Sequence, residues 1–161
     1  MISINFYVMV DENTPIICVA SDVKRDVINE VDSYLMKHPI RIGWYKYFRL
    51  SDITESNYHL NGAVGKASLS SNDESDIALG KCYAYAKCMR KLHKKRAKLF
   101  AELAKDIPAK EFREYALNRS EFYNSIAELY NNSLKLGTVR EDYINKVSKF
   151  DTEYTENYMF M

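Results

Sequence analysis

The chain has 161 residues, of which 47% are hydrophobic, and it carries 23 Lys and Arg against 22 Asp and Glu. This length fits one domain with a substantial core, and the apolar content excludes a disordered chain. Because the charges balance, any electrostatic function must come from where the charges lie. Uninterrupted apolar runs of about five residues exclude a transmembrane helix.

The first 38 residues predict a hairpin and a helix. Residues 2–10 alternate apolar and polar side chains, which is typical of a half-buried strand. The turn-forming residues 11–15 separate it from a second strand, Ile16–Ala20, which we expect to pair with the first. Apolar residues then recur at helical spacing from Val23 to Leu35. Ser21 or Asp22 is expected to cap this helix, and Pro39 to end it.

The next segment predicts two further strands. Ile40–Leu50 is rich in aromatic and β-branched residues, and Ala63–Ser70 is a weaker candidate. The polar residues 71–76 mark a boundary before the helical half of the chain.

Two long helices joined by a short connection dominate the second half. The first is expected from Ile77 to Ile107, and Pro108 is placed to begin the second. Gly137 ends the second helix, so the two must fold back antiparallel. The predicted apolar face of the second helix comprises Phe112, Tyr115, Phe122, Ile126, Leu129 and Leu136.

A short last helix and a tail complete the chain. Thr138 with Glu141 forms a predicted capping box, and Tyr143, Val147 and Phe150 form the apolar stripe of the last helix. Residues 151–161 mix acidic and aromatic side chains.

These elements predict a single α+β domain over residues 1–161. A small N-terminal antiparallel sheet with one helix (1–70) would pack on a layer (76–150) that contains the long helical hairpin and the short last helix. The acidic and aromatic tail (151–161) follows.

A basic face on the first long helix is the leading candidate for a binding surface. Between positions 87 and 98 the chain has seven positive residues and no acidic one. Six of them lie within a stripe about 140° wide, opposite the apolar face: Lys87, Arg90, Lys91, Lys94, Lys95 and Lys98. Such a stripe attracts an acidic protein surface or phosphates; the plain alternative is a solvated helix face.

Two arginines are candidates for an anion site. Arg96 and Arg119 lie on the apolar faces of the two long helices, at equal distances along the chain from the turn at 107–108. A hairpin therefore brings them to the same level. A buried charge needs a counter-charge, which could be a carboxylate from the N-terminal half, an exposed rim or a bound anion.

Other features carry less chemistry. Trp44, Tyr45 and Tyr47 form an aromatic cluster that is either an exposed interface or a covered strand. His38, His59 and His93 lack the spacing of metal ligands. We therefore predict no catalytic residue, no metal site and no cofactor. Three cysteines without CxxC spacing are typical of reduced thiols in the cytoplasm.

Three functions remain open. The first is a non-enzymatic interaction protein that docks on an acidic protein surface or nucleoprotein complex through the basic face. A composition rich in Tyr, Lys, Asn and Ile and poor in Gly and Pro favours a phage-type inhibitor or modulator of a host complex. The second is a nucleic-acid-binding regulator. The third is an enzyme or binder of an anionic small molecule at Arg96 and Arg119. Oligomeric state is left open.

Overall fold

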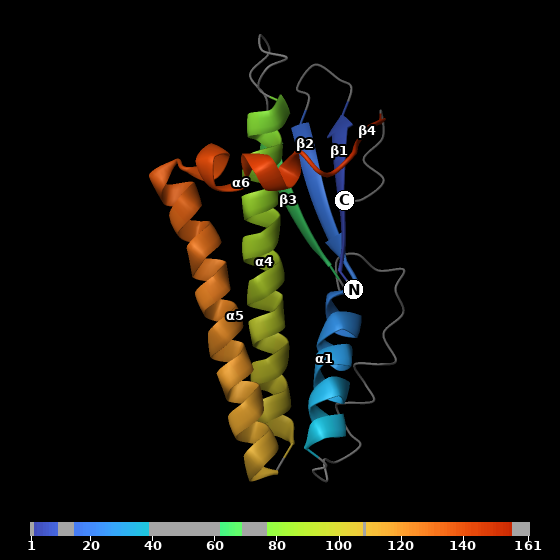
Figure 1. Ribbon diagram of the computed structural model, residues 1–161, viewed down its shortest axis with the longest axis vertical. Helices are drawn as coiled ribbons and strands as arrows, with labels where there is room; N and C mark the ends of the chain where they lie inside the picture. Colours follow the sequence, from blue (N-terminus) through green and yellow to red (C-terminus); the bar gives the residue numbers. More distant parts are fainter. Residues whose placement is uncertain (1, 10–14, 39–61, 69–76, 108, 156–161) are drawn as a thin grey trace.

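The computed structural model describes residues 2–9, 15–38, 62–68, 77–107 and 109–155 and has the α+β architecture that the sequence predicts (Figure 1). The described strands are β1 (Ser3–Met9), β2 (Pro15–Ser21), β3 (Ala63–Ser68) and β4 (Thr152–Thr155). The described helices are α1 (Val23–Lys37), α4 (Ile77–Asp106), α5 (Lys110–Leu136) and α6 (Val139–Val147).

The four described strands form one sheet in the order β3-β2-β1-β4. The predicted β1–β2 hairpin is confirmed, and β2 also pairs antiparallel with β3. The alternation in β1 has its expected effect, because Phe6 and Val8 are buried whereas Ser3 and Asn5 are exposed. β4 was missed within the predicted tail. It pairs parallel with β1 over only four residues, too few for a strand pattern to be recognised.

Helix α4 is the central element of the molecule. In Figure 1 it runs between α5 and the sheet, and α1 lies beside its lower half. One hydrophobic cluster joins the sheet to the N-terminal half of α4 and to α6, and includes Phe6, Tyr85 and Val147. A second cluster joins α1 and α5 to the C-terminal half of α4.

Gly65 permits a close approach between β3 and α4. A Cβ atom at this position would lie 2.1 Å from the carbonyl oxygen of Ala84 and 2.4 Å from the backbone nitrogen of Cys88. These are backbone atoms of α4, which cannot move aside as a flexible side chain could. The glycine is therefore a packing requirement, and the strand lies directly on the helix.

The predicted apolar face of α5 is partly wrong. Phe112 is buried, but Phe122, Leu129 and Leu136 are exposed to 47%, 64% and 76%. The face that meets α4 is rotated away from them and consists of Phe112, Ala116, Ser120, Tyr123 and Ala127. Small residues at three of these positions allow close helix packing, so the largest apolar side chains did not identify the buried face.

The predicted helix starts also differ from the structure in detail. Asp22 occupies the N-cap position of α1, but its φ is 65° and its side chain makes no capping bond. Thr138 is the N-cap of α6, yet its hydroxyl donates to the Asp142 carboxylate at 2.8 Å, so the predicted capping box is absent. α5 begins at Lys110, and Pro108 lies outside the described residues.

The predicted strand Ile40–Leu50, with Trp44, Tyr45 and Tyr47, lies outside the described residues. Within the described part of the chain, no helix combines the length and the apolar character needed to cross a membrane.

Candidate functional site

Three lysines of α4 form a row along strand β3, which we call the lysine row: Lys87, Lys91 and Lys95. Lys87 Nζ donates to the carbonyl oxygen of Lys66 at 3.1 Å, and Lys91 Nζ donates to that of Val64 at 3.0 Å. Lys95 Nζ donates in the same way to the carbonyl oxygen of Gly62.

The regular spacing of the lysine row follows from the geometry of a helix and a strand. Residues four apart on an α-helix are separated by about 6 Å along its axis. Residues two apart on a strand are separated by about 6.6 Å. Lysines at i, i+4 and i+8 therefore match carbonyl groups at every second residue of a strand running alongside.

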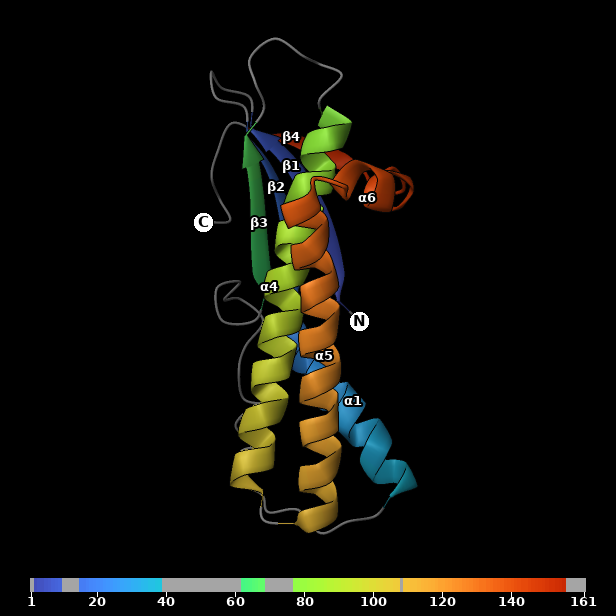
Figure 2. The same ribbon diagram turned by 90° about the vertical axis from the view of Figure 1, so that its left-hand side faces the viewer.

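The row lies on the outer side of the sheet. β3 ends the described sheet on this side, and Figure 2 shows it beside α4. Carbonyl groups at a sheet edge otherwise invite pairing with another strand, and lysine is a common means of preventing it. The ammonium groups of Lys87 and Lys91 each have three N–H donors, of which one bonds to a carbonyl of the strand.

The remaining predicted members of the basic face point in different directions. Lys94 and Lys98 are exposed. Arg90 instead turns toward α5, where its guanidinium donates to the side-chain oxygen of Asn131 at 3.0 Å. The predicted face is thus divided into a tethered row, two exposed lysines and one arginine that joins the two long helices.

The positive charges around the row influence one another. Burial lowers the pKa of Lys95, and the nearby positive charges of Lys24 and Lys91 lower it further. Lys24 belongs to α1, so the basic region extends beyond α4. Positive charges that lower one another's pKa repel each other. An anionic surface bound beside them relieves this repulsion.

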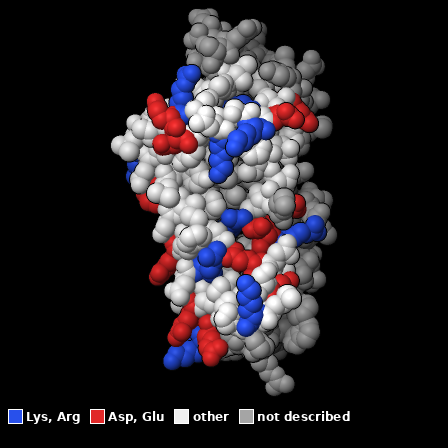
Figure 3. Space-filling view, viewed as in Figure 1, with Lys and Arg blue, Asp and Glu red and all other residues white. Residues whose placement is uncertain are grey.

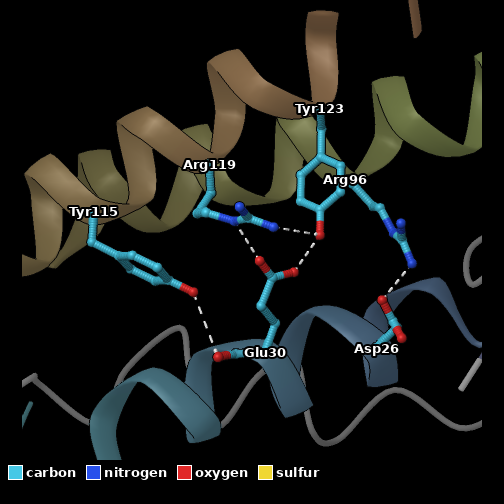
Figure 4. A network of polar contacts seen from close by, with 6 residues as sticks. All are labelled: Asp26, Glu30, Arg96, Tyr115, Arg119 and Tyr123. Carbon is cyan, nitrogen blue, oxygen red and sulfur yellow. Dashed lines mark hydrogen bonds and ion pairs between the residues drawn. The ribbon is translucent and has the colours of Figure 1, made fainter. Parts of the chain in front are cut away.

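Arg96 and Arg119 each have a carboxylate partner on α1 (Figure 4). Arg96 lies 2.5 Å from Asp26, and the Arg119 Nε atom forms an ion pair with Glu30. Of the three counter-charges considered from the sequence, the structure shows the first, a carboxylate from the N-terminal half of the chain. Asp26 and Glu30 lie four residues apart, and therefore on the same side of α1.

Tyr123 links the two arginines. The centre of its ring lies 5.0 Å from the guanidinium carbon of Arg96 and equally far from that of Arg119. Its hydroxyl donates to Glu30 and accepts a hydrogen bond from Arg119 at 3.1 Å. Burial acts to lower the pKa of Arg119, but the bond to Tyr123 and the charge of Glu30 outweigh it, so this pKa is raised.

His93, Cys18 and Cys82, whose side chains are of types that often act in catalysis, are buried among apolar or aromatic side chains. His93 lies between the rings of Tyr123 and Tyr130, with ring centres 5.8 and 5.7 Å away. Burial lowers its pKa to about 4, and Arg96 and Lys146 add to the effect. Burial also raises the pKa of the Cys18 and Cys82 thiols.

Known proteins give no further guide to the site. No family model, curated protein or solved structure matches this chain. Within the described residues, no group of three or more His, Cys, Asp and Glu side chains could hold a metal ion.

Two parts of the site were missed from the sequence. The sequence did indicate the acidic partners of the arginines, because Asp26 and Glu30 stand four residues apart in a predicted helix. It indicated the contacts of the lysine row only in part. The lysines recur every four residues, but nothing in the sequence shows which strand lies beside them.

Proposed function

We propose that this chain is a non-enzymatic binding protein that docks on an acidic surface of a protein or nucleoprotein complex through the basic side of α4. The single observation that carries the proposal is the lysine row, with its ammonium groups held along β3. Lys94 and Lys98 add two exposed charges to the same helix, and the segment from 87 to 98 contains no acid.

Tethering makes these charges more effective in binding. A free lysine loses side-chain freedom when it engages a partner, at a cost of about 0.5–1.5 kcal/mol for each immobilised side chain. In the lysine row, much of that freedom is already restricted by the bonds to β3. A partner that presents carboxylates at similar intervals therefore meets a partly pre-arranged surface.

A protein surface fits better than nucleic acid as the target. Domains that read nucleic acids are usually strongly basic as a whole. This chain has a net charge of +1, so its positive potential is local and is balanced elsewhere. Local complementarity of this kind steers association between two proteins.

The chemistry of the buried groups supports binding in preference to catalysis. His93 and the thiols of Cys18 and Cys82 are buried. Burial lowers the pKa of His93 and raises the pKa of both thiols, so each group favours its neutral form. The described cysteines, Cys18, Cys82 and Cys88, are free thiols, which supports a reducing, cytoplasmic setting. The composition bias toward Tyr, Lys, Asn and Ile supports a phage-type modulator of a host complex.

The test compares two double variants. Lys94→Glu with Lys98→Glu reverses two exposed charges of the basic side, whereas Lys105→Glu with Lys110→Glu reverses two exposed charges near the hairpin turn. Lys87, Lys91 and Lys95 stay unchanged because they also hold β3. Circular dichroism should show both variants folded, since exposed substitutions usually change stability by less than about 0.5 kcal/mol.

Binding is measured against proteins of the native host and against random-sequence duplex DNA. We expect a host protein that is captured by the wild type and by the Lys105/Lys110 variant, but lost with the Lys94/Lys98 variant. Its association rate should fall as salt is added, because exposed charges act through steering. Equal capture by all three proteins would overturn the proposal. Tight, steeply salt-dependent binding to DNA would replace it with nucleic-acid binding.

A further inference from the structure

A line of exposed apolar side chains runs along α5, on a different helix from the basic row. The described residues include five large apolar side chains that are exposed: Met36, Leu117, Phe122, Leu129 and Leu136. Phe122, Leu129 and Leu136 follow one another at intervals of seven residues. Seven residues are nearly two helical turns, so each side chain is rotated by only about 20° around the helix axis from the one before it. We call them the heptad stripe.

The positions between them complete a recognisable pattern. Asn118, Ser125 and Asn132 are exposed, uncharged and offset by three or four residues from the members of the stripe. Alternating steps of four and three residues define the seam of a coiled coil, in which one helix packs along another. Polar side chains at some seam positions set the register of such pairs. The pattern therefore indicates that another helix packs along this side of α5.

The structure leaves this side of α5 open among the described elements. α5 packs on α4 through the opposite part of its circumference, which contains Ala116, Ser120 and Ala127. Figure 3 shows an area of uncharged side chains over the middle of the molecule, with charged side chains above and below it. A row of exposed apolar side chains on one side of a helix is a typical contact surface.

We propose that α5 packs antiparallel against α5 of a second copy of this chain, about a two-fold axis at Leu129. Leu129 is the midpoint of the stripe, so the axis sets Leu129 against its own copy. The same axis sets Phe122 against Leu136 of the second copy, and the reverse. A two-fold interface must be self-complementary in this way.

The charges beside the stripe favour this antiparallel arrangement. Glu121, Glu128 and Lys135 lie along one border of the stripe, also seven residues apart. An antiparallel pair brings each Glu121 near Lys135 of the other copy, which gives two attractive pairs, and brings Glu128 near its own copy, which gives one repulsive pair. A parallel pair would instead place Glu121 and Glu128 beside the uncharged Ile126 and Ser133 of the other copy.

The first experiment measures self-association of the full chain by sedimentation equilibrium. We expect the wild type to form dimers, and Leu129→Glu to raise the dissociation constant by about 30-fold or more, as removal of a central apolar contact does. Leu117→Glu is the matched control, because it adds the same charge at an exposed leucine on another side of α5. A monomeric wild type, or equal effects of the two variants, would overturn the proposal.

The second experiment tests the register through charge exchange. Glu121→Lys and Lys135→Glu should each weaken the dimer about tenfold, and the double variant should recover wild-type affinity, because the pairs reform with opposite signs. Glu128→Gln should strengthen the dimer by removing the repulsive pair. A double variant weaker than either single one would overturn the antiparallel register. The Lys94/Lys98 variant should dimerise like the wild type, which separates this proposal from that of the basic row.

Discussion

Arg96 in α4 and Asp26 in α1 form an ion pair, 2.5 Å between nitrogen and oxygen, although they lie 70 residues apart in the chain. Both side chains are largely buried, with 14% and 24% of their surface exposed. Together with Arg119 and Glu30, this pair fixes α1 against the helical hairpin. The charges of the two arginines are thus paired within the fold itself, although both residues lie on helix faces that the sequence marks as apolar.

The pair should contribute measurably to stability. In a double-mutant cycle with Asp26→Ala and Arg96→Ala, we expect a coupling energy of about 1–2 kcal/mol, above that of a surface pair because burial reduces solvent screening. Urea unfolding of the four proteins provides the measurement. Asp32→Ala, at an exposed position of α1, is the control and should change the free energy of unfolding by less than about 0.5 kcal/mol. A coupling near zero would show that the two groups act independently.

Gly65 should tolerate no side chain. We expect Gly65→Ala to lower the free energy of unfolding by more than about 3 kcal/mol, because the added Cβ meets backbone atoms of α4 and must push β3 away from the helix. Gly137→Ala is the matched control. Its Cβ would meet nothing within 4 Å, so only the φ of 69° opposes it, at about 1–2 kcal/mol. Thermal unfolding of both variants decides, and equal losses would contradict the close approach of β3.

The rotated face of α5 gives another direct comparison. Phe112→Ala should cost about 3–5 kcal/mol, since Phe112 is fully buried, whereas Phe122→Ala should cost less than about 1 kcal/mol. Both are phenylalanines of the same helix, and the exposed Phe122 ring still has the Arg119 guanidinium 4.4 Å from its centre, so a small loss is expected there. Chemical unfolding with an unchanged m-value is the measurement. Comparable losses would restore the face that the sequence suggested.

The contrast between Phe112 and Phe122 shows what could be predicted from the sequence. Helical periodicity and the turn at 107–108 gave the hairpin, and alternation gave the β1–β2 pair. The face of α5 failed because Ala116, Ser120 and Ala127 form its contact with α4, and small residues carry little hydrophobic signal. β4 failed because a short parallel strand is defined by its neighbour, β1, and not by a pattern of its own.

The candidate site divides in the same way. The basic run from Lys87 to Lys98 is visible in the sequence, because charge is a property of each residue. That Lys91 bonds to β3 while Arg90 turns to α5 depends on how two layers are stacked, which no local pattern records. The arginine pair was predicted at one level of the hairpin, and the bond from Ser120 to the carbonyl of Ala97 shows α4 and α5 close to that alignment.

His93 should make the stability of the protein depend on pH. Its pKa falls from 6.5 to about 4 in the folded state, because burial and the charges of Arg96 and Lys146 oppose protonation. Well above pH 6.5 the ring is neutral in both states and contributes no slope. Between pH 6.5 and 4 the unfolded chain binds a proton that the folded chain does not. The free energy of unfolding therefore decreases as the pH is lowered, by at most about 1.4 kcal/mol per pH unit.

A substitution separates this effect from the titration of the carboxylates. His93→Phe retains an aromatic ring between Tyr123 and Tyr130 but cannot be protonated. The free energy of unfolding, measured by urea titration from pH 7.5 to 4, should fall less steeply for the variant than for the wild type. The two curves should be nearly parallel at the upper end of this range and diverge as the pH falls through 6.5, because every other titrating group is common to both proteins. Parallel curves over the whole range would mean that His93 is protonated in the folded state as readily as in the unfolded chain.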